Sequence, residues 1–450
     1  MRAFLALACV CVFVTAGCGG GGGGSSTGGG GGRPPVAADP TCNGIVASIP
    51  KEVLPQITSG AGVIVPASSV QRASSSGPVA HTNHLILASS THQNIKGVAP
   101  SGTPAPDGLN PVQMRGAYGV PDGGGAGGAI AIVDAFDYPT SLADFNVFST
   151  QFGLPTETSV DATNAANTVF QVVYATGSKP SADGGWAQEE ALDTQWAHAM
   201  APAAKIYLVE AATPSVTDLM AAVNVAKNLP GVKQVSMSWG VHPESGCMYV
   251  QNDSSFLSPG VTFFAASGDT AGERDFPALS SNVVAVGGTH LSVRSDGLWL
   301  GETVWNDTNA GQGTGCGHSG VEPRPVFQDK VYSLVGLFRT GNDISADGDP
   351  NTGVAVYDST VSGGFSGWLV FGGTSLSTPV IAGIVASSGA TIDSSKALNT
   401  LLYAGIKGPN FHDVVSGSAG GFTAKVGYDI PSGVGTPNGL GTFISAGARP

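Results

Sequence analysis

A serine flanked by glycines is the strongest chemical signal in the sequence. Residues 372–379 read GGTSLSTP. Two glycines permit a tight turn and a close backbone approach to a bound substrate. Ser375 would then stand at the start of a helix, where free N–H groups and the helix dipole favour a developing negative charge. Ser375 is therefore a candidate nucleophile for a carbonyl carbon; the alternative is that it merely caps the helix.

Two acidic residues could supply the base that such a serine needs. Glu189 and Asp193 are four residues apart, so on a helix they share one face. Two carboxyls held close together cannot both ionise easily, which separates their pKa values and lets one act as a base in acid. The alternative is an ordinary solvated helix face. Histidine is the more usual base, and His198, in the same expected helix, is the candidate of that kind.

A third carboxyl follows an expected strand. Asp269 closes the sequence Ser267-Gly268-Asp269, directly after the apolar run 261–266. If this carboxyl stayed protonated, it could donate a hydrogen bond to an oxyanion, as a neutral carboxylic acid can. The alternative is an Asp that ends a strand in a turn.

The elements that must position these residues alternate between strands and helices. Expected strands cover 84–87, 129–133, 169–174, 205–209, 234–238 and 261–266, and expected helices cover 141–152, 187–200, 216–228 and 379–388. This alternation predicts an α/β fold, with a parallel sheet that has helices on both faces. In such sheets, chemistry gathers in loops beyond the carboxyl ends of the strands, which is where the three candidates fall.

Taken in order, these segments resemble the sedolisins, or serine-carboxyl peptidases, and in particular kumamolisin-like bacterial members. The similarity runs from about Leu109 to Gly441 and includes 130–135 (IAIVDA), 235–240 (VSMSWG) and the serine loop. It implies a subtilisin-like three-layer fold with a mostly parallel central sheet. It also implies four roles: Ser375 as nucleophile, Glu189 as general base, Asp193 as the carboxylate that orients Glu189, and Asp269 as the protonated oxyanion donor.

The resemblance also implies a substrate-binding wall. Ser238, Trp239 and Gly240 are similar to the family's cleft strand, which pairs with the substrate backbone. Asp275 matches a position near the substrate-binding subsites and would favour a basic side chain; the alternative is a structural Asp before Phe276-Pro277.

A structural calcium ion is the cofactor that the resemblance implies. Two carboxylates and two carbonyl groups would bind one Ca²⁺ near the C-terminus: Asp413, Asp429, Val414 and Gly427, with Lys425 offering a further carbonyl. Oxygen-only ligands from a looped segment suit this ion.

The N-terminal part predicts export. Residues 1–18 have a positive residue, Arg2, before a short apolar run, and read as a signal peptide. Small residues before Cys18 resemble a bacterial lipoprotein signal, which would lipidate Cys18 and tether the protein to a membrane; ordinary signal cleavage is the alternative. A Gly/Ser-rich linker (19–40), a short pro-segment or N-terminal extension (41–108) and the peptidase catalytic domain (109–450) would follow.

Composition limits the classes of partner and of cysteine chemistry. Charged residues are 11% of the 450, and the net charge is −13. The sequence offers no Lys/Arg cluster that could follow a phosphate backbone, which argues against nucleic-acid binding. Cys42, Cys247 and Cys316 lie beyond the signal, and Cys247–Cys316 is the preferred disulfide; the absence of CxxC pairs argues against a zinc or redox site.

These observations and the resemblance predict a secreted, monomeric serine-type endopeptidase that acts in acid on proteins or peptides, outside the cell or in the periplasm. If Cys18 is lipidated, the protein would be an outer-membrane lipoprotein. Two alternatives stay open: a subtilisin-type peptidase with His198 as its base, and a non-catalytic surface module that binds peptides on the same fold.

Overall fold

The computed structural model describes residues 62–72, 74, 77–87, 106–308 and 311–447. The chain divides into two units, Met1–Ala38 and Asp39–Pro450, and every described residue belongs to the second. The predicted signal peptide, the linker, Cys18 and Cys42 lie outside the described residues. Within the described part of the chain, the helices are too short or too polar to cross a membrane.

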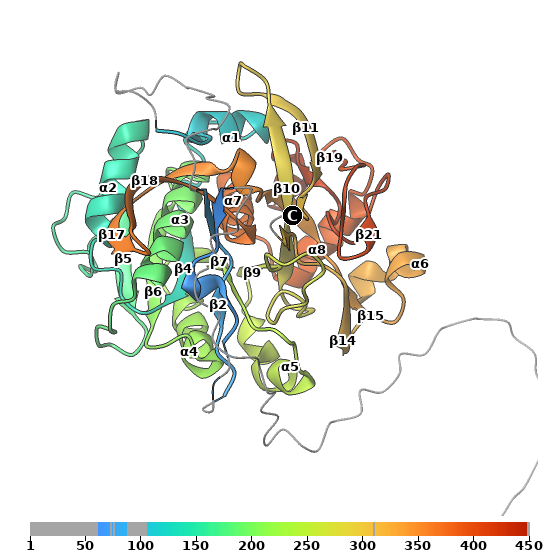
Figure 1. The fold of residues 1–450 in the computed structure, drawn as a ribbon, viewed down its shortest axis with the longest axis horizontal. Helices are drawn as coiled ribbons and strands as arrows, with labels where there is room; N and C mark the ends of the chain where they lie inside the picture. The colour runs from blue at the N-terminus through green and yellow to red at the C-terminus, as the bar shows by residue number, and fades with distance from the viewer. Residues whose placement is uncertain (1–61, 73, 75–76, 88–105, 309–310, 448–450) are drawn as a thin grey trace, which may run out of the picture. The chain divides into compact units, whose positions relative to one another are not determined.

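An eight-stranded sheet forms the centre of the unit (Figure 1). In spatial order its strands are β11 (Trp299–Val304), β10 (Val284–Val293), β9 (Thr262–Ala266), β7 (Val232–Met237), β4 (Ala129–Ala135), β6 (Lys205–Ala211) and β5 (Phe170–Tyr174), with β16 (Ile344–Asp347) also paired to β10. All of these pairings are parallel except β10 with β11. The sheet is therefore mostly parallel, as predicted.

The sequence of β4 explains its central place. All seven residues of β4, AIAIVDA, are buried, because helices cover both faces of a parallel sheet and leave no side of the strand for water. The strand is almost entirely apolar, and its one charged residue, Asp134, comes near the carboxyl end. A buried charge at that edge points to chemistry rather than packing.

Helices cover the two faces of the sheet. On one face lie α3 (Gly184–Met200), α7 (Thr374–Ser387) and α8 (Ser395–Ala404), with α2 (Ser141–Phe152) packed outside α3; on the other lie α4 (Val216–Ala226) and α5 (Gly246–Asn252). Each face has its own hydrophobic core. The subtilisin-like three-layer arrangement predicted from the resemblance is confirmed.

Helix α3 is unusual because every residue from Trp186 to Met200 is buried. It packs on the sheet, on α7, on α2 and on β17, so no side of it is left to solvent. Asp183 caps its start by accepting hydrogen bonds from the N–H groups of Gly185 and Trp186. Ionisable side chains on this helix must therefore be functional or neutral, since isolated buried charges are costly.

The segment before residue 109 contributes strands to the unit. A second, antiparallel sheet has the order β1 (Val63–Ile64), β3 (Leu85–Leu87), β18 (Phe365–Gly372) and β17 (Val354–Ser362). Between its first two strands the chain forms β2 (His81–Thr82), which pairs with β8 (Trp239–Gly240). Figure 1 shows this segment in blue, alongside α3. The domain boundary near residue 109 stays a prediction.

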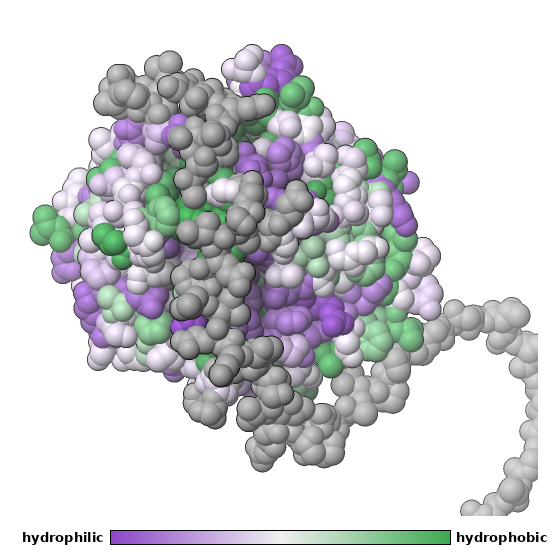
Figure 2. Space-filling view, in the orientation of Figure 1, coloured by the Kyte–Doolittle hydropathy of each residue, from purple (hydrophilic) through white to green (hydrophobic). Residues whose placement is uncertain are grey.

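The remaining elements are short. They are α1 (Pro111–Ala117), β12 (Asn306–Asp307), β13 (Gln312–Gly313), β14 (His318–Pro323), α6 (Tyr332–Val335), β15 (Phe338–Thr340), β19 (Phe411–His412), β20 (Ser418–Ala419), β21 (Phe422–Thr423), β22 (Thr436–Pro437) and α9 (Gly441–Gly447). On the face shown in Figure 2, hydrophobic and hydrophilic residues are interspersed.

The predicted disulfide is wrong. Cys316 is a buried free thiol whose Sγ lies 3.6 Å from the carbonyl oxygen of Ala419. Cys247 is disulfide-bonded, but not to Cys316. Because its partner lies outside the described residues, sequence position within the catalytic region was a poor guide to pairing.

Candidate active site

Ser375 lies at the second residue of α7, directly after β18 and a glycine turn. Gly373 has φ of 102°, a left-handed conformation that favours glycine. A Cβ at Gly373 would overlap the Asn83 carbonyl oxygen and the Asp269 carboxyl, so the position is also closed to larger residues by contact. The turn therefore brings the N–H of Ser375 and the carboxyl of Asp269 to one place.

The helix begins five residues earlier than the sequence predicted. Pro379 lies in the second turn of α7, not in the first. Because proline lacks an N–H, it cannot bond the carbonyl of Ser375 four residues before it. The hydroxyl of Ser238 lies 3.4 Å from that carbonyl oxygen and donates to it. The helix tolerates Pro379 because a side chain from the cleft wall takes the place of the missing donor.

Glu189 and Asp193 lie on one face of α3, as predicted, but in a buried environment. Both side chains are 0% exposed, so the alternative of a solvated helix face is wrong. Burial raises the pKa of Glu189 to about 8, while the neighbouring Ser375 side chain, the Asn83 N–H and Asp193 oppose the rise. Burial also raises the pKa of Asp193 well above its usual value, with the charges of Asp134 and Glu189 adding to the effect. The two carboxyls share protons as a pair.

Asp134 is a third member of this group that sequence reasoning missed. It is fully buried near the end of β4, and both of its carboxyl oxygens lack a hydrogen-bond partner among the described residues. Burial, followed by the charge of Glu189, raises the pKa of Asp134 well above its usual value. The signal was available: a single Asp closes an otherwise apolar strand.

Asp269 is held as an oxyanion donor would be. Its Oδ1 accepts hydrogen bonds from the Thr374 N–H at 2.7 Å and from the Thr374 hydroxyl at 2.9 Å. Its Oδ2 is buried and without a partner in the described structure. Burial raises the pKa of Asp269 well above its usual value. Because Oδ1 is occupied as an acceptor, Oδ2 is the oxygen that would hold the proton of a neutral Asp269, and it lies beside Gly373.

A peptide segment of the chain itself occupies this place. The carbonyl oxygen of Asn83 accepts the N–H of Ser375 at 2.9 Å, and the N–H of Asn83 lies 3.2 Å from the carbonyl oxygen of Ser238. The same N–H lies 3.1 Å from Ser375 Oγ, which donates to the Ser238 carbonyl at 3.1 Å. A serine hydroxyl beside a carbonyl whose oxygen is held by a backbone N–H is the arrangement that precedes acyl transfer.

The residue after Asn83 contacts the candidate base. His84 Nδ1 lies 2.7 Å from Glu189 Oε2, and both side chains are fully buried. Burial lowers the pKa of His84 to about 3. Since both groups are then uncharged over a wide pH range, the carboxyl O–H of Glu189 donates to Nδ1. In this state Glu189 cannot accept a proton from Ser375.

The predicted cleft wall pairs with the same segment. Thr82 is paired with Trp239 and His81 with Gly240 in an antiparallel register. The Trp239 side chain points into the core, where Nε1 donates to the Val133 carbonyl at 3.0 Å. Ser238, Trp239 and Gly240 therefore contact the segment through backbone atoms. Backbone contacts of this kind bind extended chains without regard to sequence.

Asp275 lies in an acidic subsite beside this strand. It is 0% exposed, and its Oδ2 lies 3.5 Å from His81 Nε2. Burial by itself would lower the pKa of His81, but Asp275 outweighs it and raises that pKa to about 9. Glu273 and His242 lie next to Asp275. Whether Asp275 favours a basic substrate side chain or is a structural Asp stays a prediction.

His198 does not reach the site. Its Nε2 lies 2.9 Å from the Pro155 carbonyl oxygen, and its ring lies 4.7 Å from that of Phe145. Burial lowers its pKa to about 4. The structure therefore contradicts the His198-dependent alternative, because the ring faces α2 and not the serine.

The predicted calcium residues come together from two loops. Asp413 accepts the Gly427 N–H at 2.9 Å, and Asp429 accepts the N–H groups of Lys425 at 3.0 Å and Ser432 at 2.8 Å. Burial raises the pKa of Asp429 to about 6, and the charge of Asp413 adds to it. Two neighbouring carboxylates that repel each other form an oxygen donor set that fits a hard cation.

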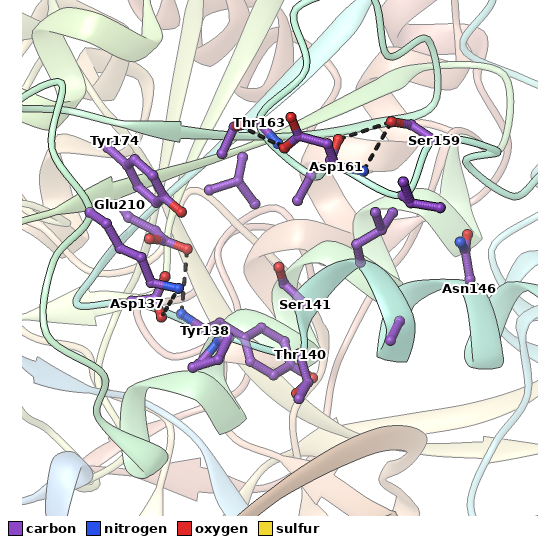
Figure 3. Close-up of a pocket in the computed structure, with 17 residues that line it drawn as sticks. Asp137, Tyr138, Thr140, Ser141, Asn146, Ser159, Asp161, Thr163, Tyr174 and Glu210 are labelled. Atoms are coloured by element: carbon purple, nitrogen blue, oxygen red, sulfur yellow. Dashed lines mark hydrogen bonds and ion pairs between the residues drawn. The ribbon is translucent and has the colours of Figure 1, made fainter.

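A polar cavity of about 540 Å³ opens at the carboxyl ends of β4, β5 and β6 (Figure 3). Asp137, Tyr138, Tyr174 and Glu210 line it, and Lys179 Nζ lies 3.1 Å from Asp137 Oδ2. Glu210 is in register with Asp134 across the sheet. Buried acids therefore continue from the Glu189–Asp193 pair, through Asp134, towards this cavity.

Comparisons with known proteins agree with this architecture. The model of the subtilase family (Peptidase_S8) matches residues 175–399. Kumamolisin of Bacillus sp. (strain MN-32) is 33% identical over 376 residues, which cover 76% of this chain and 64% of kumamolisin. Sedolisin of Pseudomonas sp. (strain 101) is 31% identical over 261 residues, which cover 51% of this chain and 43% of sedolisin.

A solved structure gives the same result. The complex of Pseudomonas sedolisin, a serine-carboxyl proteinase, with two molecules of pseudo-iodotyrostatin aligns with a TM-score of 0.61 and 26% identity. The alignment covers 74% of this chain and 96% of that one. The curated relatives are longer than the match: this chain spans 64% of the length of kumamolisin and 43% of that of sedolisin.

Proposed function

Because the chain belongs to the subtilase family, as a member of its sedolisin type, we propose that it is a serine-carboxyl endopeptidase that cleaves proteins or peptides in acid. One observation carries the proposal. The Asn83 carbonyl accepts the Ser375 N–H and lies beside Asp269 Oδ2, which has no partner among the described residues, and the Asn83 N–H lies 3.1 Å from Ser375 Oγ. Nucleophile, oxyanion donors and a bound peptide thus meet at one point.

The proposed reaction is acyl transfer. Glu189 takes the proton of Ser375 as Oγ bonds to the scissile carbonyl carbon. Together with burial, the neighbouring carboxyls of Asp193 and Asp134 set the pKa of Glu189, and Asp193 shares a proton with it. The Ser375 N–H and protonated Asp269 donate to the oxyanion. The peptide nitrogen leaves as an amine with the proton from Glu189. Water then attacks the acyl-enzyme and frees Ser375.

Acid action follows from two opposite protonation requirements. Glu189 must be ionised to accept a proton, whereas Asp269 must be protonated to donate a hydrogen bond. Activity is therefore lost as pH falls below the pKa of the Glu189–Asp193 pair and is lost again as pH rises above that of Asp269. Residues 77–87, which contain Asn83 and His84, cover the site and are called the covering segment. Its release would expose Glu189 to water, which lowers the pKa of Glu189 and permits activity at lower pH.

The experiment that tests this function is a comparison of two Asp269 variants. Asp269→Ala should reduce kcat by about 100- to 1000-fold, since one oxyanion donor is lost. Asp269→Asn should retain more activity and extend it towards neutral pH, because an amide donates without titrating. Hydrolysis of a denatured protein between pH 2 and 8 measures both.

Asp296→Ala, at an exposed loop position where Asp296 pairs with Arg294, serves as the control and should keep the parent profile. Full activity in Asp269→Ala would remove Asp269 from the mechanism. If the parent shows no turnover at any pH after limited proteolysis, the chain is a peptide-binding module on the same fold.

The substrate preference proposed here is a basic side chain two residues before the scissile residue. His81, two residues before Asn83, lies at Asp275 and near Glu273. Lysine or arginine at this position would present a positive charge to the same two carboxylates.

One structural Ca²⁺ is proposed to bind Asp413, Asp429 and the carbonyls of Val414 and Gly427. When bound, the ion would neutralise the two carboxylates and stabilise the C-terminal loops; it supplies no chemistry to the reaction. We expect EDTA to lower the Tm of Ser375→Ala protein, with recovery on adding Ca²⁺ but not Mg²⁺, which demands a tighter octahedral site. Asp429→Asn should already have the lower Tm and should not respond to EDTA. An identical EDTA response in that variant would place the ion elsewhere.

Export to the periplasm or the outside of the cell, lipidation of Cys18 with an outer-membrane tether, and a monomeric state complete the proposal. Mass analysis of the mature N-terminus distinguishes a lipidated Cys18 from ordinary signal cleavage.

A further inference from the structure

The acidic subsite that is proposed to recognise a basic substrate side chain also brings together groups that could bind a metal ion. His81, Glu273 and Asp275 each offer one ligand atom, and these three atoms lie within 4.8 Å of one another. His81 comes from β2 of the N-terminal segment, whereas Glu273 and Asp275 come from the loop after β9. The set therefore joins the covering segment to the body of the unit.

The spacing of these atoms suits a shared ion better than a direct bond. His81 Nε2 lies 3.5 Å from Asp275 Oδ2, and His242 Nδ1 lies 3.4 Å from Asp275 Oδ1. Hydrogen bonds between charged N–H groups and carboxylates are shorter, about 2.7–2.9 Å. Ligand atoms around a tetrahedral ion bound at about 2.0–2.2 Å lie about 3.3–3.6 Å apart. The 3.5 Å between His81 Nε2 and Asp275 Oδ2 falls in this range, and the Glu273 oxygen lies within 4.8 Å of both.

The atoms that His81 and Asp275 contribute are buried and accept or donate no hydrogen bond in the described structure. His81 Nε2 and both carboxyl oxygens of Asp275 lack hydrogen-bond partners within the described residues. Gly268 leaves room for the two acids to converge: a Cβ there would lie 2.8 Å from Glu273 Oε2 and 3.1 Å from Asp275 Oδ2. Glu273 is half-buried, and among the described residues its Oε2 accepts only the Thr270 N–H, at 3.3 Å. Two converging carboxylates favour a cation, and the His81 imidazole, once its proton is displaced, completes a metal donor set.

We propose that His81, Glu273 and Asp275 bind one divalent transition-metal ion of the Zn²⁺ type, with His242 or water as the fourth ligand. A nitrogen and two carboxylate oxygens at tetrahedral spacing are ligands that Zn²⁺ accepts. Because His81 belongs to the N-terminal segment and the two acids belong to the loop after β9, the ion holds that segment in the cleft. After a cut following Asn83, the ion would keep the cut segment bound. The competing arrangement is a direct ion pair between protonated His81 and Asp275.

The test uses the full chain with Ser375→Ala, so its outcome does not depend on whether the protein is a peptidase. Equilibrium dialysis against ZnCl₂ at pH 7, with Ca²⁺ in excess to occupy the Asp413–Asp429 loops, measures the stoichiometry and Kd. We expect one Zn²⁺ per chain and a Kd at least about 100-fold weaker in His81→Ala and in Asp275→Asn.

Limited proteolysis provides a second measurement. Zn²⁺ should slow cutting of residues 62–87 in the parent and have no such effect in His81→Ala. His290→Ala is the matched control, because His290 also pairs with an aspartate, Asp349 at 2.8 Å, away from this subsite; it should bind Zn²⁺ like the parent.

Circular dichroism of each variant checks that the fold is kept. Glu273→Gln should also weaken Zn²⁺ binding, and it leaves the residues of the N-terminal segment unchanged. Equal Zn²⁺ binding by His81→Ala and the parent, or no binding by the parent at millimolar ZnCl₂, overturns the metal site and leaves the direct ion pair.

Discussion

Ser375→Ala should leave the full chain uncut between Asn83 and His84 and should reduce hydrolysis of a denatured protein by at least about 1000-fold, the loss expected when a serine nucleophile is removed. The parent, incubated over a range of pH, should instead yield a fragment that begins at His84. Mass spectrometry of the incubated protein identifies the new end.

The cleavage position follows from the contacts of Asn83. Its carbonyl oxygen accepts the Ser375 N–H, and Ser375 Oγ lies 3.1 Å from its N–H. Both contacts are made by Asn83, so its carbonyl carbon is the one we expect Oγ to attack, and that carbon belongs to the Asn83–His84 bond. A tethered substrate reacts without the entropy cost of association. The reaction is nevertheless slow in the covered state, since Glu189 carries a proton that it donates to His84.

Ser377→Ala is the matched control for Ser375→Ala. Ser377 lies on the same helix and is equally buried, but its hydroxyl donates to the carbonyls of Ala346 and Asp347. Its loss should reduce stability by about 1–2 kcal/mol and leave self-cleavage intact. A cut after Asn83 in Ser375→Ala would assign the cleavage to another peptidase or another nucleophile.

The folded protein should be more stable in acid than at neutral pH. Several buried carboxyls have pKa values raised by burial, Glu189 and Glu210 to about 8 and others well above their usual values; the latter are Asp134, Glu190, Asp193, Asp269 and Asp347. On unfolding, each would return to its ordinary value near 4.

The sign of the effect follows from the protons bound in each state. Above the ordinary carboxyl pKa, and for Glu189 and Glu210 up to about pH 8, these groups hold protons in the folded state that the unfolded chain has released. Each proton that only the folded state holds makes the free energy of unfolding fall as pH rises. Two buried histidines, His84 and His198, act in the opposite direction below about pH 6.5, because burial lowers their pKa values. The carboxyls outnumber them, so stability falls towards neutral pH.

Thermal unfolding of Ser375→Ala, which cannot digest itself, measures this prediction. We expect the Tm to fall by about 10 °C or more from pH 5 to pH 8. Glu190→Gln should flatten the slope, because both oxygens of Glu190 are buried and without a partner in the described structure. A Tm that rises over this range would show that the carboxyls are ionised in the folded state.

Local pattern was sufficient for most of the elements. The apolar runs that became β4 and β9 were predicted within two residues, and 141–152 was predicted with the bounds that α2 has. A few neighbouring residues are enough to predict a strand that is buried on both faces. The same holds for a helix with start and stop signals at its ends. The start of α7 was placed too late because Pro379 was assigned to the first turn, whereas Ser238 supplies the donor that allows proline in the second.

By itself, the sequence determined the α/β class and nominated Ser375, Glu189, Asp193 and Asp269, because residue types and short spacings are local properties. Tertiary structure decided what surrounds them. It decided that α3 is buried on every side, so that burial raises the pKa values of its acidic residues. It also decided that Asp134 lies close enough to Glu189 for their charges to interact. It also decided that Asn83 and His84, about a hundred residues before α3, lie against the serine and the base. Burial and contacts between distant segments depend on how the whole chain packs, and no local pattern in the sequence reports them.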